Sequence, residues 1–267
     1  MPAPDLELIS LKPSQANGAP PLLLLHGAFA GAWCWQGVQA QLAAAGYTSH
    51  ALSLRGHGQS SGFWELAHNQ LGDYLADVRQ ALAQIGEPCI LLGHSLGGYL
   101  AQEIARATPP KALILLASIP PYGLAGSLQY MSTVHPQLLL GLQGFALGHT
   151  TQLDAAMLRH LLFAPETPML QVEAFASRAQ PESMAALGEL WLPQWWKNWP
   201  QTVNYPVWVL GAEHDNIIPW SDVALTAQAW GVSAERLPAA GHAMMWDSSA
   251  AAFSARLCAW LAAQRWD

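Results

Sequence analysis

Short apolar runs alternate along the chain with longer segments in which apolar residues recur every three or four positions. The runs are typical of buried strands, and the longer segments are typical of helices with one face against a core. The expected strands are Leu22–Leu25, Cys89–Leu92, Ala112–Leu116, Val207–Leu210 and one around Glu235–Leu237. The clearest helix is expected over residues 71–85, with Asp77 on a polar face, and another in the C-terminal segment around Leu257. This alternation predicts an α/β fold with a mostly parallel central sheet.

One of the expected strands runs directly into Gly93-His94-Ser95-Leu96-Gly97, and a helical pattern follows. A serine between a strand and a helix adopts strained backbone angles, so small residues are needed two places to either side. The free amides at the start of the helix favour negative charge beside Ser95. This context predicts a nucleophile elbow, and the alternative is an ordinary glycine-rich turn whose serine caps the helix.

A serine hydroxyl is a poor nucleophile unless a base takes its proton and an acid orients that base. The strand Val207–Leu210 leads into a loop that places Asp215 where catalytic groups gather in open parallel sheets, just past a strand end. Glu213 on the same loop is the nearest rival, for which we expect a surface role. Asp222 is expected to lie in the first turn of the next helix without a further role.

The candidate base is His242, one of ten histidines. It follows Gly241 on the turn between the last expected strand and the final helix, which places it above the sheet. The alternative is a loop histidine without a catalytic role. The order Ser95, Asp215, His242 along the chain is the order that a strand-to-helix elbow of this type requires.

Attack on a carbonyl also needs donors for the oxyanion that forms. The amide of Leu96, directly after Ser95, is one candidate, and the amide of Ala28, in the loop after the first buried strand, is the other. Phe29, Met244 and Trp191 are the candidate substrate-binding side chains. His26 is expected to have a structural role.

The pattern changes between residues 121 and 201, where several short helical segments contain many Pro, Gly, Met and Trp residues and no clear strand. We expect this segment to form a helical cap, or lid, on a core made of residues 1–120 and 202–267. The tryptophans Trp191, Trp195, Trp196 and Trp199 either pack against the core or face the cleft, and packing is the more common role of aromatic residues.

Composition limits the classes of partner. Of 267 residues, 52% are hydrophobic and 11% are charged, and the net charge of −7 disfavours binding to nucleic acid or to anionic membranes. No apolar stretch approaches the length of a membrane-spanning helix, and the N-terminus lacks a secretory signal pattern, so we expect a cytoplasmic protein. The three cysteines are scattered and resemble small core residues. No metal or cofactor is implied, the expected partner is a small-molecule substrate, and the oligomeric state is not predicted.

The chain resembles the α/β-hydrolase superfamily at four places: His26-Gly27-Ala28, Gly93 to Gly98, Asp215 and Gly241-His242. The loop from Ser53 to Ser60 also resembles that family's glycine-rich turn after the next strand. The resemblance implies an α/β-hydrolase fold with helices on both faces of the sheet and the cap inserted after the sixth strand, near Ala112–Leu116.

Within that superfamily, the segment from His26 to Trp35 looks like the small-ester carboxylesterases related to plant methylesterases and hydroxynitrile lyases. The lyases carry a lysine directly after the catalytic histidine, where this chain has Ala243, and the dehalogenases and epoxide hydrolases of the fold carry aspartate in place of Ser95. The expected function is hydrolysis of esters of small or medium apolar substrates through an acyl-enzyme. The alternatives are a carbon–carbon bond hydrolase with the same triad and a non-catalytic small-molecule receptor of this fold.

Overall fold

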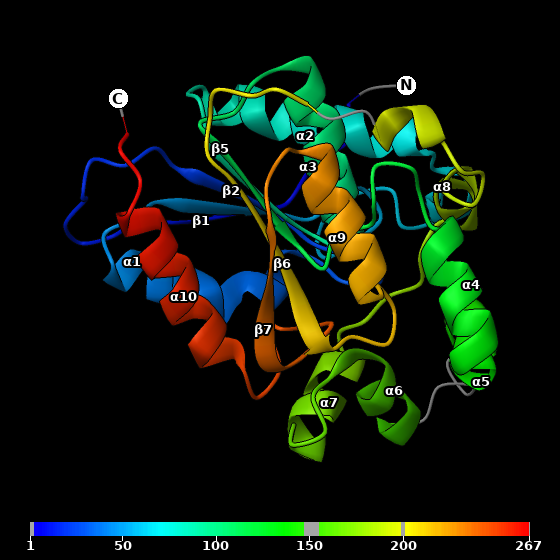
Figure 1. Cartoon of the computed structure of the whole chain (residues 1–267). Coiled ribbons are helices and arrows are strands. Elements are labelled where there is room, and N and C mark those ends of the chain that lie inside the picture. The colour runs from blue at the N-terminus through cyan, green and yellow to red at the C-terminus, as the bar shows by residue number, and fades with distance from the viewer. Residues whose placement is uncertain (1–2, 147–154, 199–200, 267) are drawn as a thin grey trace.

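The protein is described from a computed structural model, which describes residues 3–146, 155–198 and 201–266 (Figure 1). A seven-stranded sheet with strand order β1-β3-β2-β4-β5-β6-β7 runs through its centre. The strands are β1 (Leu8–Leu11), β2 (Leu22–Leu25), β3 (Ser49–Leu52), β4 (Ile90–His94), β5 (Ala112–Leu116), β6 (Val207–His214) and β7 (Ala234–Gly241). β1 pairs antiparallel with β3, and the other neighbouring strands are parallel. The mostly parallel α/β sheet expected from the sequence is confirmed.

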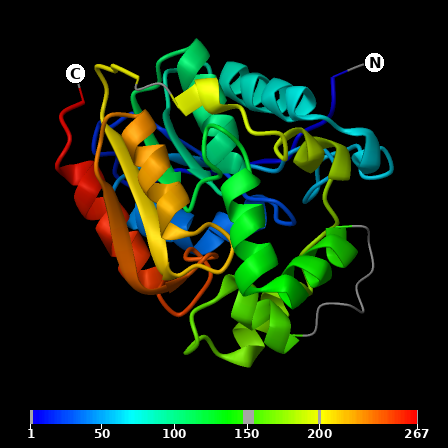
Figure 2. The same cartoon turned by 45° about the vertical axis from the view of Figure 1, so that its right-hand side comes forward.

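Helices cover both faces of the sheet (Figures 1 and 2). They are η1 (Ala32–Trp35), α1 (Gln36–Ala44) and α10 (Ala250–Ala262) on one face, and η2 (Leu66–His68), α2 (Leu71–Ile85), α3 (Leu96–Ala107) and α9 (Trp220–Ala229) on the other. The side chains of β2 alternate between two hydrophobic clusters, with Leu22 and Leu24 in one and Leu23 and Leu25 in the other. A strand covered on both faces has no polar side, which explains its continuous apolar run.

Three elements have the extents that the sequence predicts. The strand Leu22–Leu25, the helix over residues 71–85 and the strand Ala112–Leu116 match β2, α2 and β5, although β5 is the fifth strand along the described chain and not the sixth. β6 continues past Leu210 to His214, because it stays paired with β7 up to the contact of His214 with Gly241. Glu213 therefore lies on a strand and not on a loop.

Asp77, expected on a polar face of its helix, and Asp222, expected in a first helical turn without a further role, are both buried. Asp77 of α2 is fully buried and receives hydrogen bonds from the guanidinium of Arg55, with an Nη2–Oδ1 distance of 2.7 Å. Asp222 of α9 is also buried and accepts hydrogen bonds from the hydroxyls of Tyr122, at 2.6 Å, and Ser127, at 2.7 Å. Periodicity alone missed both, because their partners lie far away in the sequence.

The chain between β5 and β6 forms a helical insertion. Its described elements are α4 (Ala125–Val134), α5 (Pro136–Ala146), α6 (Ala155–Leu162), α7 (Met169–Ala176), α8 (Met184–Glu189) and η4 (Trp195–Asn198). In Figure 2, α4 to α7 lie beyond the carboxyl ends of the central strands. Trp191 is 42% exposed and Trp196 is exposed, whereas Trp199 lies outside the described residues. None of the helices in the described part of the chain has the length and apolar character to cross a membrane.

A buried ion pair joins the insertion to the core. Nε2 of His57, in the loop after β3, lies 3.2 Å from Oε2 of Glu182, and both side chains are fully buried. Although burial opposes the charged forms, the charge of Glu182 raises the pKa of His57, and the charge of His57 lowers the pKa of Glu182. The hydroxyl of Tyr74 also donates to Glu182, at 2.5 Å.

This pair predicts a stability that depends on pH. The raised pKa of His57 contributes stability in full below its usual value of 6.5, and that contribution is lost as the pH rises through the folded-state pKa. The lowered pKa of Glu182 contributes stability above its usual value of 4.5, which is lost as the pH falls through the folded-state pKa. The pair therefore stabilises most between these two usual values and less at alkaline pH.

The variant Glu182→Gln tests this prediction, with Glu182→Ala for comparison. The glutamine amide can donate to the neutral imidazole, whereas alanine leaves a buried charge or a cavity and is expected to cost about 3–5 kcal/mol. Urea unfolding between about pH 5.5 and 8.5 should show a smaller decline for Glu182→Gln than for the wild type. Equal declines in both proteins would contradict the assignment.

Candidate active site

Ser95 lies at the sharp turn between β4 and α3, and its backbone is strained, with φ at +51°. The flanking glycines permit this turn. A Cβ placed on Gly93 would lie 2.3 Å from the carbonyl oxygen of Gly97, and one on Gly97 would lie 2.4 Å from the carbonyl oxygens of Leu25 and His26. Any larger residue at either place would force the turn away from the sheet.

The side chain of Ser95 does not cap α3, because the helix has no side-chain hydrogen bond at its N-cap. Ser95 is 8% exposed and lines a pocket together with His242. The alternative expected from the sequence, in which Ser95 only caps the helix, therefore does not fit α3.

Asp215 and His242 are in contact. Nδ1 of His242 lies 2.9 Å from Oδ2 of Asp215, and both residues are buried. The other carboxylate oxygen, Oδ1, accepts the amides of Ile217 and Ile218, each at 2.9 Å. With Oδ2 accepting the proton on Nδ1, the imidazole keeps Nε2 available as a base. Glu213, the rival acid, is exposed and accepts the amide of Ala239 at 2.8 Å.

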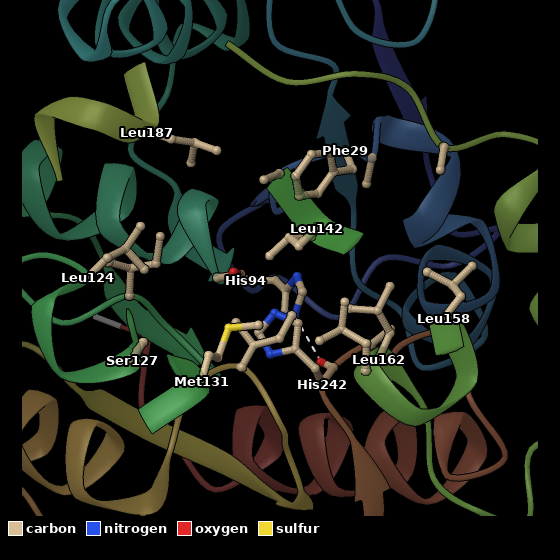
Figure 3. Close-up of a pocket in the computed structure, with 18 of the residues that line it drawn as sticks. Phe29, His94, Leu124, Ser127, Met131, Leu142, Leu158, Leu162, Leu187 and His242 are labelled. Carbon is tan, nitrogen blue, oxygen red and sulfur yellow. Dashed lines mark hydrogen bonds between the residues drawn. The ribbon is translucent and has the colours of Figure 1, made fainter. Parts of the chain in front are cut away.

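His94, the residue directly before Ser95, connects the elbow to the histidine turn. Its Nε2 lies 2.9 Å from the backbone carbonyl oxygen of His242, drawn as a dashed line in Figure 3, and the two rings are 4.6 Å apart. Burial and the neighbouring His242 hold the pKa of His94 well below its usual value, so the ring is neutral and Nε2 donates. Sequence spacing does not predict this contact, because the two residues are 148 positions apart.

The loop after β2 lies directly beside Ser95. A Cβ on Gly27 would be 3.0 Å from Cβ of Ser95, and the next residue, Ala28, lines the same pocket as the serine. Leu96 begins α3, where backbone amides have no partner within the helix. His26 holds this loop, because its Nε2 accepts the amide of Leu54 at 3.0 Å and burial lowers its pKa to about 3.

The pocket is lined by apolar side chains from the core and the insertion (Figure 3). Its volume is about 120 Å³, of the same order as the ~150 Å³ cavity that holds one benzene molecule in another protein. The side chains include Phe29, Ile119, Leu124, Leu128, Met131, Leu142, Leu158, Leu162, Phe175, Leu187, Trp191, Ile217 and Met245. No Asp, Glu, Lys or Arg side chain is among the described residues that line it.

Two of the three candidate substrate-binding residues, Phe29 and Trp191, line this pocket. Met244 does not, because its side chain is fully buried in the hydrophobic core, and the neighbouring Met245 takes the place at the pocket wall. A turn with two successive methionines cannot be assigned to a face from sequence alone.

Two other pocket residues carry a thiol or a hydroxyl, and the surroundings of both disfavour a role as nucleophile. Burial raises the pKa of Cys34 far above its usual value, so its thiol stays protonated. The hydroxyl of Ser127 donates to Asp222 at 2.7 Å. Within the described residues, His, Cys, Asp and Glu side chains form no group of three that could hold a metal ion.

Most of the chain is similar to a known protein family. Residues 22–256 match the model of a family described as the alpha/beta hydrolase family. Over 109 residues the chain is 36% identical to a pimeloyl-[acyl-carrier protein] methyl ester esterase of Pectobacterium carotovorum subsp. carotovorum (strain PC1), which covers 40% of each protein. Over 110 residues it is 34% identical to methylesterase 7 of Arabidopsis thaliana, which covers 39% of this chain and 42% of that protein. These matches span less than half the length of either relative.

Solved structures resemble the chain over nearly its whole length. An esterase from Exiguobacterium antarcticum superimposes with a TM-score of 0.75 at 17% identity, covering 97% of this chain and 96% of that one. A thermophilic esterase from Thermogutta terrifontis superimposes with a TM-score of 0.71 at 19% identity, covering 97% and 93%. At these identities the likeness concerns the fold. Together with the family match over residues 22–256, it shows that the chain belongs to the alpha/beta hydrolase family.

Proposed function

We propose that this protein is a serine hydrolase that cleaves carboxylic esters of small or medium apolar substrates. The proposal depends on one observation: Ser95, on its strained turn, and His242, in contact with Asp215, line the same apolar cavity. The relatives named as methyl ester esterase and methylesterase support the same reaction class.

In the proposed mechanism, Nε2 of His242 takes the proton of the Ser95 hydroxyl as its oxygen attacks the ester carbonyl. Asp215 holds the imidazole and stabilises its charged form. The amides of Ala28 and Leu96 donate to the oxyanion, and each such donor contributes about 3 kcal/mol to the stability of the transition state. His242 then protonates the departing alcohol and activates the water that hydrolyses the acyl-enzyme.

We also propose that residues 121–201 act as a cap on a core made of residues 1–120 and 202–267. Helices α4, α5 and α6 of the insertion supply much of the pocket wall, including Leu128, Met131, Leu142 and Leu158. A pocket closed by apolar side chains excludes water and strengthens the electrostatic interactions within it.

The chemistry of the pocket predicts a preference for uncharged substrates. A carboxylate on the acyl chain would enter a wall with no positive side chain and would lose its hydration, which costs several kcal/mol. Para-nitrophenyl butyrate should therefore be hydrolysed with a kcat/KM at least about 100-fold above that of the matching ester of succinate. Similar values for the two esters would contradict the assignment of this cavity as the acyl site.

The proposed reaction is tested by a panel of esters, thioesters, lactones and a vinylogous diketone, together with covalent labelling by a fluorophosphonate. The expected result is multiple turnover of neutral esters and a label on the peptide that contains Ser95, located by mass spectrometry. Turnover of the diketone alone would favour carbon–carbon bond hydrolysis. Labelling without multiple turnover on any substrate would favour a receptor, and either result would overturn the proposal.

A further inference from the structure

The last residue of α6 and the two residues after it, 162–164, lie against the turn that carries His242. The amide of Ala243 donates to the carbonyl oxygen of Leu162 at 2.8 Å. On the other side of His242, a Cβ placed on Gly241 would lie 2.4 Å from the carbonyl carbon of Phe163. Both chain neighbours of the histidine are therefore in direct contact with the backbone of the insertion.

A buried carboxylate, Asp247, completes this contact. Its Oδ2 accepts the amide of Gly241 at 2.7 Å, and its Oδ1 accepts the amide of Ser249 at 2.6 Å and also the hydroxyl of that serine. The amide of Ala164, on the insertion, donates to the same carboxylate. Asp247 is 1% exposed, and burial raises its pKa despite these donors. One side chain thus ties the two ends of the histidine turn to each other and to the insertion.

Further contacts hold the same two surfaces together. The indole of Trp246 donates to the carbonyl oxygen of Gln171 at 3.1 Å, and the amide group of Gln171 donates back to the carbonyl of Trp246. The loop that carries Asp215 is attached as well, because Nδ2 of Asn216 donates to the carbonyl oxygen of His160 at 2.6 Å. In Figures 1 and 2, α6 and α7 accordingly lie at the ends of β6 and β7.

We propose that Asp247 is a positioning residue: together with residues 162–164 of the insertion it holds the turn that carries His242, and so fixes the position of the imidazole in the pocket that it shares with Ser95. This inference rests on the proposed function, because it assigns His242 as the base. In it, the α6–α7 stretch is a fixed part of the catalytic apparatus and not a detachable lid. Leu162 also lines the pocket, so the same stretch connects the substrate space to the base.

The test compares Asp247→Asn with a matched control, Asp222→Asn. Asparagine has the shape of aspartate but only one acceptor oxygen, so its amide group must face either the Gly241 or the Ser249 donor, and the turn shifts. A shift of about 1 Å in a catalytic group can lower a rate by about 100-fold. We expect kcat for a neutral ester to fall by about tenfold to 100-fold in Asp247→Asn, with KM within about twofold of the wild type.

Asp222 is the appropriate control because it is also a buried carboxylate that accepts hydrogen bonds from the insertion, at Tyr122 and Ser127, and neither donor belongs to the turn around His242 or to the loop that carries Asp215. Asp222→Asn should lower the unfolding temperature by a similar amount while its kcat stays within about twofold of the wild type. The rate at which a fluorophosphonate labels Ser95 should fall in Asp247→Asn by the same factor as kcat and should stay unchanged in the control.

A folded Asp247→Asn with wild-type kcat and labelling rate would overturn the inference, and so would an equal loss of kcat in both variants. If Asp247→Asn does not fold, Gly241→Ala decides, because its methyl group would push the turn away from Phe163 while the carboxylate stays in place. A folded Gly241→Ala with unchanged kcat would then overturn it. Failure of the proposed function is distinguishable, because the wild type itself would then show neither turnover nor labelling of Ser95.

Discussion

Replacing Ser95 by alanine is expected to lower kcat for the best neutral ester by about 10⁶-fold, the loss seen when the nucleophile of another serine hydrolase is removed. The alanine cannot form the acyl-enzyme, and neither the thiol of Cys34 nor the hydroxyl of Ser127, which also line the pocket, can replace the serine. Cys34 stays protonated because burial raises the pKa of its thiol, and Ser127 is held by Asp222. Turnover is measured with purified variant at high enzyme concentration, so that a residual rate is detectable.

The same variant should remain folded, which makes the loss of activity interpretable. The Ser95 hydroxyl does not cap α3, and the close packing of the elbow comes from its backbone and from Gly93 and Gly97. We expect its unfolding free energy within about 1 kcal/mol of the wild type. A Ser95→Ala protein that hydrolyses short para-nitrophenyl esters at the native rate would remove the whole mechanism.

The parts of the fold that follow from local sequence were predictable. The strand Ala112–Leu116 is apolar without interruption because it is covered on both faces, and the helix over residues 71–85 has the spacing of a one-sided helix. The end of β6 was not predictable in this way, because Gly211 to His214 continue as a strand only through pairing with β7.

Long-range partners explain the remaining differences. Asp77 is buried because it binds Arg55 of the loop after β3, and Asp222 is buried because it binds Tyr122 and Ser127 of the insertion. Neither set of partners can be identified from the local sequence pattern. The candidate catalytic side chains could be identified because each follows a strand or begins a helix. Their supports could not, since the sequence spacing of His94 and His242, or of Ala164 and Asp247, carries no periodic signal.

The insertion therefore has two kinds of contact with the core. α4 and α5 meet the pocket mainly through apolar side chains such as Leu128, Met131 and Leu142, and the hydroxyl of Ser127 on α4 also donates to the buried Asp222. The stretch around Leu162 is bound by backbone hydrogen bonds and by a buried carboxylate.

Replacing Asp215 by asparagine is expected to lower kcat by about 10⁴-fold, with little change in stability. The asparagine oxygen can still accept the amides of Ile217 and Ile218, so the loop keeps its shape. The amide group then takes the place of Oδ2 and donates to Nδ1 of His242. The imidazole proton therefore lies on Nε2, and a protonated Nε2 cannot accept the proton of Ser95.

The matched control is Glu213→Gln. Glu213 lies near the end of β6 and is the other acid that the sequence offered for the role of Asp215. Glu213 is exposed and accepts the backbone amide of Ala239 in β7, and that amide can equally donate to glutamine. Its kcat should stay within about twofold of the wild type. Steady-state kinetics on one neutral ester decide between the two acids: if Glu213→Gln loses activity and Asp215→Asn retains it, the carboxylate that orients His242 has been assigned to the wrong residue.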